Sequence, residues 1–512
     1  MIETVPPRQI IATKKITRIH VWTNASISRW SLLLIVAFQG ILSWALLQNT
    51  AFQDEALYIY AGRQILQNWL FGQRLYDRYS YYFSGNPNVY PIIAGGLDML
   101  GGLELARAFS LLCMLITTCC GYYVTKMLFG QRSAVFAALF FVCQGPVLFL
   151  SRLATYDPMC LCLIALATLV AVRSSSPSRR PWGALLLGPL LVLAFGTKYA
   201  ALLFMPSVLA ILGLNALLKR GWLSLLVRGS LGIISLVAMA LVGAYLAIHY
   251  DPNMLHALAA TTTNRIVIEV YSRKALLLHV IQMVGISYLI GIAGLFFARK
   301  KNVLLVLLFV GSALLVPAYH IYKAELISLD KHLGFSMFFL MPVAGYVLAS
   351  LSGFHWRFSR GRYWLAGVAA CLILFMVGAK EAQDMYSIWP ASDQLSYVLN
   401  TQVRDNNGYY LAEQFEVSRY NLRADTQTWQ WTGLDFFEYK DSLGRYYQGN
   451  EAYVQAIHNG YFALVQLNYG YNVPTAVLIA KAIADSKKYE LIAKIPYRDY
   501  YGTGVYWVWR KR

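Results

Sequence analysis

Two acidic residues stand side by side, Asp54 and Glu55, shortly after the first long apolar run of the chain, Leu32 to Leu47. That run predicts a helix that crosses a membrane, so the acids are expected just beyond its end. A carboxylate there suits general base chemistry on a substrate carried by lipid, because a base must lie within hydrogen-bond reach of the proton it takes. The structural alternative is that Asp54 caps a helix, with Glu55 in its first turn.

A second acid, Asp157, precedes a proline at the start of a later apolar run. Its expected depth matches that of Asp54, and two acids at one depth favour a site more than either alone. The alternative is again a helix start, with the proline at the first helical position. We take Asp54, Asp157 and Glu55 as candidate catalytic residues. If a metal takes part, Asp54 and Asp157 are its expected ligands and Mg²⁺ or Mn²⁺ is the cation; no other cofactor is expected.

Basic residues are expected near the same face. Lys198 lies between two short apolar stretches, where a lysine is costly and usually marks a pathway or an anion site. Lys331 and His332 open a later apolar run, and Arg152 precedes Asp157. Each has an ordinary explanation, since long basic side chains extend to the lipid headgroups. Together they predict a site for a phosphate or pyrophosphate leaving group.

The loop after the first span, residues 48–104, is rich in tyrosine and in turn residues. Apolar side chains recur at helical spacing over residues 54–70, which predicts an amphipathic helix lying in the membrane interface. Turn chemistry follows in the segment Gly85-Asn-Pro-Asn-Val-Tyr-Pro91. Tyr82, Asn86 and Tyr90 of this part are candidate substrate-binding residues.

The composition is that of a polytopic membrane protein. Of 512 residues, 58% are hydrophobic and 13% are charged, and the mean hydropathy is +0.47, which excludes an ordinary soluble assembly of domains. We predict 11 spans. They are 31–48, 105–128, 133–150, 156–173, 183–197, 199–216, 226–248, 277–297, 303–320, 332–351 and 363–379.

The net charge of +19 does not indicate a nucleic-acid partner, because the excess is confined to one side of the predicted membrane. With the N-terminus inside, the inner segments hold nineteen bases and a single acid. This bias predicts a cytoplasmic tail over residues 1–30. The odd number of spans then places residues 380–512 outside the cytoplasm, and the partner of the apolar surface is the lipid bilayer.

Residues 380–512 have a different composition and predict a small α/β domain. The expected helices are 391–403, 449–459 and 474–487, and the expected strands are Tyr409–Ala412, Tyr461–Leu467, Tyr489–Pro496 and Gly504–Trp509. The domain holds no nucleotide-binding glycine motif and no Cys/His set with zinc spacing. All seven cysteines fall inside predicted spans, so we expect buried thiols and no disulfide in the outer parts.

The order of these features resembles the GT-C glycosyltransferases. Within them it is most similar to the bacterial branch of protein O-mannosyltransferase-like and aminoarabinose-transferase-like enzymes, of the family 39 type. The resemblance rests on the acid pair after the first span, Ser-Gly-Asn-Pro-Asn-Val-Tyr-Pro in the loop, Leu-Ala-Arg107, Thr-Tyr-Asp157-Pro and Gly-Thr-Lys198-Tyr. Asp54 matches the family's catalytic acid of the first loop, and Asp157 matches its second external acid.

The resemblance implies a GT-C-like helical domain over residues 31–379 and an extracytoplasmic α/β domain over 380–512. It further implies an enzyme of the bacterial plasma membrane that takes a hexosyl or pentosyl group from a polyprenyl-phosphate donor. The sugar would pass, with inversion, to an extracytoplasmic acceptor, which is a lipid, a glycan or a protein. One departure is clear: relatives that modify lipid A carry Glu-Lys just before the loop proline, where this chain has Gly85-Asn86. Donor-phosphate recognition must therefore come from elsewhere, and this argues against an aminoarabinose or lipid A assignment.

Two other functional classes fit the same charges. One is a transporter or flippase of a lipid-linked saccharide, whose route the acids and lysines would line. Transporters tend to show internal symmetry with broken helices in matching halves, and the sequence shows no such repeat. The other is a non-catalytic membrane subunit whose outer domain binds glycan, and its function would tolerate loss of Asp54.

Overall fold

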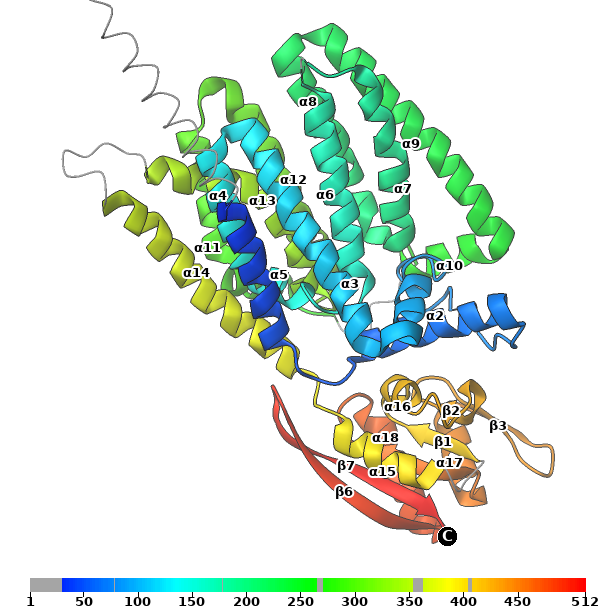
Figure 1. Ribbon diagram of the computed structural model, residues 1–512. Helices are drawn as coiled ribbons and strands as arrows, with labels where there is room; N and C mark the ends of the chain where they lie inside the picture. Colours follow the sequence, from blue (N-terminus) through cyan, green and yellow to red (C-terminus); the bar gives the residue numbers. More distant parts are fainter. Residues whose placement is uncertain (1–29, 78, 177, 265–269, 353–361, 404–407) are drawn as a thin grey trace, which may run out of the picture. The chain divides into compact units, whose positions relative to one another are not determined.

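The computed structural model of the chain describes residues 30–77, 79–176, 178–264, 270–352, 362–403 and 408–512. Residues 1–29 of the expected N-terminal tail lie outside the described residues. The chain forms two compact units (Figure 1). The helical unit comprises Met1–Ala45, Ser110–Arg152 and Asp157–Ala382, and the α/β unit comprises Leu46–Phe109, Leu153–Tyr156 and Gln383–Arg512.

The helical unit is built from long apolar helices, several of which run side by side in Figure 1. After the helix Trp30–Leu46 come α3 (Tyr90–Phe129), α4 (Gln131–Val142), α5 (Gly145–Leu150), α6 (Tyr156–Ser174), η1 (Pro181–Leu186), α7 (Leu187–Thr197), η2 (Tyr199–Leu203), α8 (Met205–Arg220), α9 (Trp222–Tyr250), α10 (Met254–Thr261), α11 (Arg273–Phe297), η3 (Lys300–Asn302), α12 (Val303–Lys323), α13 (Leu329–Leu351) and α14 (Arg362–Ser387). Helix α13 packs against α4, α11 and α12. The cysteines are free thiols, and all but Cys119 are buried.

Seven of the helices in the described part are long and apolar enough to cross a membrane, and three shorter apolar helices accompany them. The predicted count of 11 spans is not confirmed. The predicted span 133–150 consists of two helices, α4 and α5, because the chain leaves helical hydrogen bonding at Cys143 and Gln144. Helix α3 begins well before the predicted span 105–128 and is interrupted at Gly101 and Gly102, where Gly102 adopts a φ of 68° that glycine accommodates without strain.

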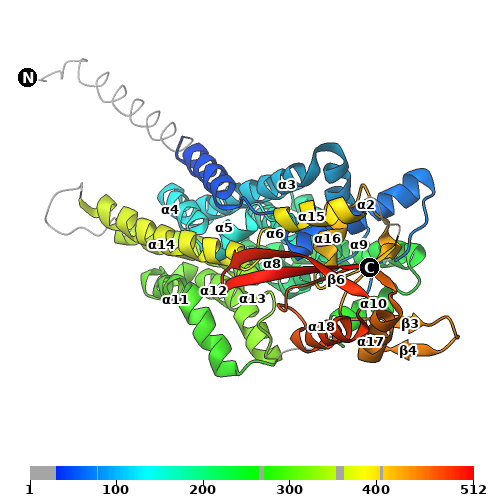
Figure 2. The same cartoon turned by 90° about the horizontal axis from the view of Figure 1, so that it is seen from below.

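A five-stranded mixed sheet forms the centre of the C-terminal part. Its strands are β1 (Tyr409–Ala412), β2 (Trp431–Thr432), β5 (Phe462–Leu467), β6 (Tyr489–Asp499) and β7 (Gly502–Lys511), in the order β2-β1-β5-β7-β6. Strand β1 is parallel to both of its neighbours, and β7 is antiparallel to β5 and β6. A separate hairpin of β3 (Glu438–Lys440) and β4 (Tyr446–Gln448) projects beside α17, the helix Gly449–Asn459 (Figure 2).

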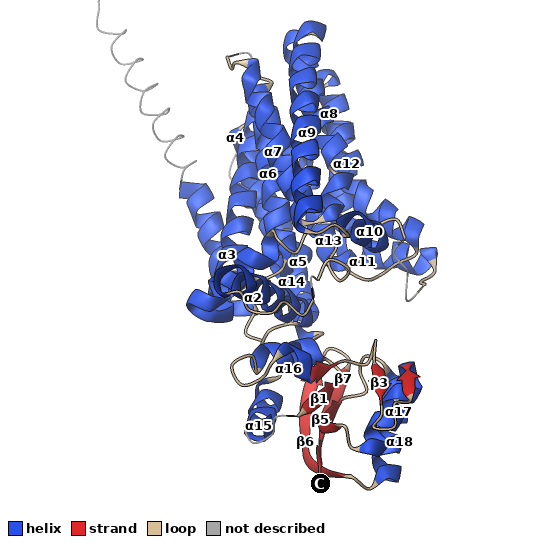
Figure 3. Cartoon of the chain, turned by 90° about the vertical axis from the view of Figure 1, so that its right-hand side faces the viewer, coloured by secondary structure: helices blue, strands red, loops and turns tan. Residues whose placement is uncertain are grey.

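Helices cover both faces of this sheet, as Figure 3 shows. Alternate residues of a strand point to opposite faces. Leu411 and Val465 therefore join the core under α17 (Gly449–Asn459) and α18 (Val473–Ser486). Tyr410 and Leu464 join the core on the other face, under α15 (Asp393–Val403). The predicted helices and strands of the tail are all present, whereas α16 (Phe415–Asn421), β2 and the β3–β4 hairpin were not predicted.

The first loop contributes α2 (Gln53–Phe71), the helix expected from Asp54 onward, to the α/β unit. This helix and the start of α3 approach each other backbone to backbone. A Cβ on Gly62 would stand 1.7 Å from the carbonyl oxygen of Pro91, and a Cβ on Gly95 would stand 2.4 Å from the amide nitrogen of Arg63. Glycine at both positions is therefore required for the packing that holds α2 in place.

We predict that Gly95→Ala lowers the thermal stability of the protein, because the added methyl group must push α2 and α3 apart. Gly96→Ala is the matched control, since its Cβ would meet only the flexible Leu66 side chain at 3.4 Å and alanine favours a helix over glycine by about 1 kcal/mol. Thermal unfolding of the purified variants in detergent measures both. Equal melting temperatures for the two variants would contradict the close approach.

Candidate active site

Glu55 is the centre of a buried ion pair in the α/β unit. Its carboxylate receives Nε and Nη2 of Arg107 at 3.0 and 2.7 Å, and both side chains are almost completely buried. The backbone amides of Phe52 and Ala154 also donate to it, at 3.0 and 2.8 Å. Arg107 in turn donates to the carbonyl oxygens of Asn49 and Thr50. Four donors fill the carboxylate, so Glu55 is held as an acceptor and is not placed to take a proton.

Asp54 occupies the first turn of α2 and is half-buried. The alternative that Asp54 caps this helix is wrong: the N-cap position is Phe52, and Glu55 is the residue whose carboxylate accepts from the Phe52 amide. Negative charge in the first turn is stabilised by the unpaired amides of the helix end. Asp54 therefore places a carboxyl group at the end of α2 that favours negative charge.

Asp157 and Lys198 form the corresponding pair in the helical unit. The Lys198 ammonium group donates to Oδ1 of Asp157, and the two side chains are 3% and 0% exposed, in that order. Lys198 therefore does not extend to a lipid headgroup, which was its ordinary explanation. It lies at a break between α7 and η2, with extended backbone angles of −151° and 126°. The break turns a charged side chain into the bundle of apolar helices, where charges are expensive and usually functional.

His332 extends this pair. Its Nε2 lies 4.0 Å from Oδ1 of Asp157, and its Nδ1 lies 2.9 Å from Nε2 of His320. The Nδ1 of His320 is 2.8 Å from the carbonyl oxygen of Glu325, so this nitrogen must carry a proton. A neutral His320 then accepts from His332 through Nε2. His320 was not predicted as a site residue. It lies in the last turn of α12, twelve positions before its partner His332, and no local sequence pattern connects the two.

The other predicted cations have different surroundings. Arg152 is 2% exposed, and its guanidinium lies 3.7 Å from the centre of the Trp44 ring, so part of its role is packing. Lys331 is half-buried at the start of α13. Arg152, Lys331, Lys198 and His332 all belong to the helical unit together with Asp157, whereas Asp54 and Glu55 belong to the α/β unit. The convergence of Asp54 with Asp157 stays a prediction.

The three predicted substrate-binding residues of the first loop differ in exposure. Tyr82 is 58% exposed. Asn86 makes a turn, in which its side-chain oxygen accepts from the Asn88 amide at 2.8 Å. Tyr90 is completely buried, with its ring 6.5 Å from that of Tyr58.

A second buried acid of the α/β unit, Asp98 of α3, was not predicted from the sequence. It accepts from Arg63 at 2.7 Å, from the Tyr420 hydroxyl at 2.6 Å and from Arg423 at 3.3 Å. Burial and the charge of Asp98 raise the pKa of Tyr420, so this hydroxyl stays a donor. Asp98 is the sole acid between Asp77 and Glu104, and this isolated position was the sequence feature that could have marked it as a candidate. It joins the first loop to the C-terminal part within one unit.

The described residues contain no group of three or more His, Cys, Asp or Glu side chains suited to hold a metal ion. Asp157, one of the two expected ligands, is instead paired with the Lys198 ammonium group. A carboxylate that is paired with an ammonium group is poorly suited to bind a divalent cation.

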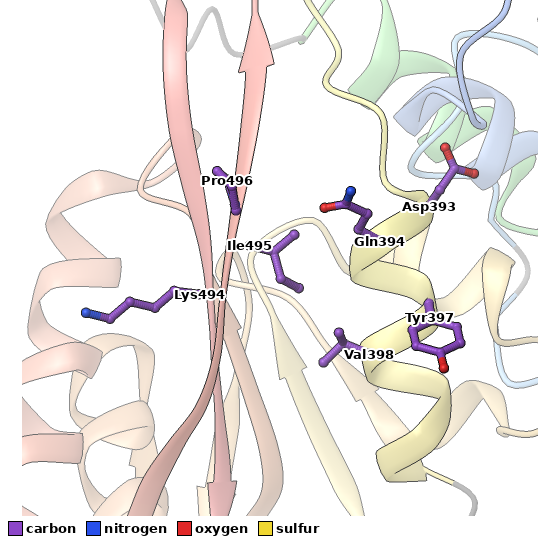
Figure 4. Close-up of a pocket in the computed structure, with 7 residues that line it drawn as sticks. All are labelled: Asp393, Gln394, Tyr397, Val398, Lys494, Ile495 and Pro496. Atoms are coloured by element: carbon purple, nitrogen blue, oxygen red, sulfur yellow. The ribbon is translucent and has the colours of Figure 1, made fainter.

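A groove of about 500 Å³ lies between α15 and β6 in the α/β unit. In Figure 4, Gln394 and Val398 of α15 face Ile495 of β6, while Lys494 points away from the helix. The predicted site residues do not line this groove, so it forms no part of the candidate active site.

The fold has solved counterparts among membrane glycosyltransferases. ArnT from Cupriavidus metallidurans in the apo state is 14% identical, with a TM-score of 0.61 over 94% of this chain and 98% of that chain; the structure bound to undecaprenyl phosphate has the same score and identity over 93% and 97%. The archaeal oligosaccharyltransferase AglB from Archaeoglobus fulgidus, in complex with an inhibitory peptide and a dolichol-phosphate, is 11% identical, with a TM-score of 0.53 over 93% and 74%. Arabinofuranosyltransferase AftD from Mycobacteria is 13% identical, with a TM-score of 0.52 over 94% and 40%.

These likenesses show a GT-C-like fold, a polytopic helical part followed by a sheet-containing C-terminal part. Residues 87–247 match the family described as dolichyl-phosphate-mannose-protein mannosyltransferase. That segment includes Arg107, Asp157 and Lys198. No curated protein matches the chain in sequence.

We predict that Arg107→Met destabilises the protein by roughly 3–5 kcal/mol, because it leaves the Glu55 charge buried without its partner. The double variant Glu55→Met/Arg107→Met should recover only part of this loss, since the amides of Phe52 and Ala154 then lack an acceptor. Thermal and urea unfolding measure the effect. Arg510→Met is the control, because Arg510 pairs with Glu490 on the surface, where the two side chains are 43% and 40% exposed, and its melting temperature should stay at the wild-type value. A wild-type melting temperature for Arg107→Met would contradict the role of the pair.

Proposed function

We propose that the chain is an inverting glycosyltransferase that moves a sugar from a polyprenyl-phosphate donor to an acceptor outside the cytoplasm, in the plasma membrane of a bacterium. The observation that carries the proposal is the buried Asp157–Lys198 pair with His332 beside it, since such charges within apolar helices usually serve a ligand. The solved structures of similar fold that hold undecaprenyl phosphate and dolichol-phosphate support the donor class.

In this proposal Asp54 is the general base and Glu55 is the residue that positions it. The acceptor hydroxyl gives its proton to the Asp54 carboxylate, and the oxygen forms a bond to the anomeric carbon of the donor sugar. Glu55 is excluded as the base, because Arg107 and two backbone amides occupy its oxygens. Attack from the side opposite the phosphate inverts the configuration at the anomeric carbon.

Lys198 and Lys331 act on the leaving group. As the bond between the anomeric carbon and the phosphate oxygen breaks, both electrons stay with the phosphate, and fixed positive charge stabilises it. Asp157 holds the Lys198 ammonium group in place inside the bundle, and the Nε2 of His332 lies 4.0 Å from the same carboxylate. No step passes through a divalent cation.

We predict that Asp54→Asn lowers sugar transfer by about 10²–10⁴-fold, the usual contribution of a positioned base. The isosteric change should leave the melting temperature unchanged. The measurement is release of polyprenyl phosphate when purified protein meets a panel of polyprenyl-phosphate hexoses and pentoses, with an extract of bacterial membrane as the source of acceptor. Asp485→Asn, at an exposed position of α18, is the matched control and should retain wild-type turnover.

The same assay separates the functional classes. A flippase would move the lipid-linked sugar across the membrane without releasing polyprenyl phosphate, and a non-catalytic subunit would release none. Transfer by Asp54→Asn at the wild-type rate would show that another group is the base.

We further predict that Lys198→Gln lowers the turnover number by about 10²–10³-fold, as expected for the loss of one group that stabilises developing negative charge. The acceptor KM should change little, because Lys198 acts on the donor phosphate. Lys219→Gln, at an exposed position of α8, is the matched control. A rise in KM for the donor with an unchanged turnover number would instead assign Lys198 to ground-state binding.

A further inference from the structure

The α/β unit contains a deeply buried guanidinium group. Arg419 of α16 is 6% exposed. Its guanidinium lies 4.4 Å from the centre of the Tyr60 ring and 4.9 Å from that of Phe415. Within the described residues it makes no ion pair, and its buried Nε has no hydrogen-bond acceptor. Arg107, the other deeply buried arginine of this unit, has four acceptors, so the condition of Arg419 is exceptional and costly.

A second buried polar group lies in the same region. Tyr79 is 2% exposed, and its hydroxyl has no partner among the described residues. Burial raises the pKa of Tyr79 and the guanidinium of Arg419 opposes that rise, so the two groups lie within electrostatic reach of each other. A buried hydroxyl without a hydrogen-bond partner is unfavourable, because burial removes the water that would otherwise bind it. Tyr79 also has a φ of 62°, in the left-handed region that non-glycine residues adopt uncommonly.

The Glu416 carboxyl group interacts with Arg419, and a further carboxyl group and a tyrosine lie within electrostatic reach of Glu416. Burial raises the pKa of Glu416, which interacts with Arg419 and Asp435, and burial also raises the pKa of Asp435. The ring of Tyr82 lies 6.3 Å from that of Tyr79 and is 58% exposed. Tyr471, which is 49% exposed, interacts with both carboxyl groups. The cluster therefore combines one guanidinium, two carboxyl groups and several phenol rings.

This combination selects the class of ligand. A phosphate or carboxylate would meet two carboxyl groups for one guanidinium, so an anion is disfavoured. A sugar hydroxyl both accepts and donates. It can accept from Arg419 Nε or the Tyr79 hydroxyl and donate to Glu416, while the C–H face of the ring packs on a tyrosine. Such a ligand satisfies the buried donors without adding charge.

We propose that Arg419, Tyr79 and Glu416 form a saccharide-binding subsite in the α/β unit. As a place for the acceptor's glycan, this inference rests on the proposed glycosyltransferase function. Sugar binding itself does not depend on that function, because it requires neither donor nor turnover.

The test is saturation-transfer NMR of the full chain in lipid nanodiscs, with methyl glycosides of glucose, galactose, mannose, N-acetylglucosamine and arabinofuranose as probes. At least one glycoside should bind. Tyr79→Phe should weaken that binding by about fivefold or more, the loss expected for one hydrogen bond, and Arg419→Gln should weaken it further. Tyr79→Phe removes an unpaired buried hydroxyl, so its melting temperature should equal or exceed that of the wild type. A purely structural tyrosine would not combine that stability with weaker sugar binding.

Matched controls are Tyr501→Phe, in the exposed turn between β6 and β7, and Arg512→Gln, at the exposed end of the chain; both should bind as the wild type does. Binding of none of the glycosides, or equal binding by Tyr79→Phe and Arg419→Gln, overturns the proposal. Displacement of the bound glycoside by inorganic phosphate at comparable concentration would make the subsite an anion site and overturns the saccharide class. Asp54→Asn should bind the glycoside normally, so a failure of the transferase proposal and a failure of this subsite give different results.

Discussion

The bidentate pair of Glu55 and Arg107 is the interaction on which the candidate site depends. It connects the start of α2, the preceding segment through Asn49 and Thr50, the interior of α3 and the amide of Ala154. A buried ion pair contributes little stability of its own, because desolvation offsets the attraction. The main effect of this pair is to fix geometry, because its hydrogen bonds are satisfied together in only one arrangement of the two side chains. Successive residues of a helix point about 100° apart, so an immobile Glu55 sets the direction in which Asp54 points.

Lys198 and Asp157 form a second buried pair, in the helical unit, where the Nε2 of His332 lies 4.0 Å from the same carboxylate. The interruption between α7 and η2 is what brings the lysine into the bundle. In a continuous helix, the Lys198 ammonium group would have reached only the neighbouring turns of its own helix. The pair therefore has the character of a preorganised electrostatic site, in which fixed charge is in place before a reaction creates the charge that it opposes.

The sequence was most informative where a local pattern decides the structure. Helix α17 and strands β5, β6 and β7 follow from periodicity within each segment, and the apolar runs identify the helical unit. Helix α16 has only seven residues, too few for a period to emerge, and it carries Arg419 and Tyr420. The break at Cys143 was hidden because hydropathy averages over a window, whereas a break depends on individual backbone hydrogen bonds. The break at Lys198 instead coincides with the boundary between the predicted spans 183–197 and 199–216. Glu55 and Arg107 are 52 positions apart, and no local sequence pattern connects them. Their ion pair could therefore be recognised only in the three-dimensional structure. Asp157 and Lys198 were each selected for their own setting, and their pairing likewise emerged only in the fold.

Strand β6 lies at one edge of the sheet and is eleven residues long. A long open edge is a template on which a strand from another molecule can add, and crowding at a membrane surface would favour that event. Pro496 lacks the amide proton that such an addition needs, and Lys494 and Arg498 place charge two residues to either side of it. Proline and charged side chains on an edge strand are features that discourage such an addition.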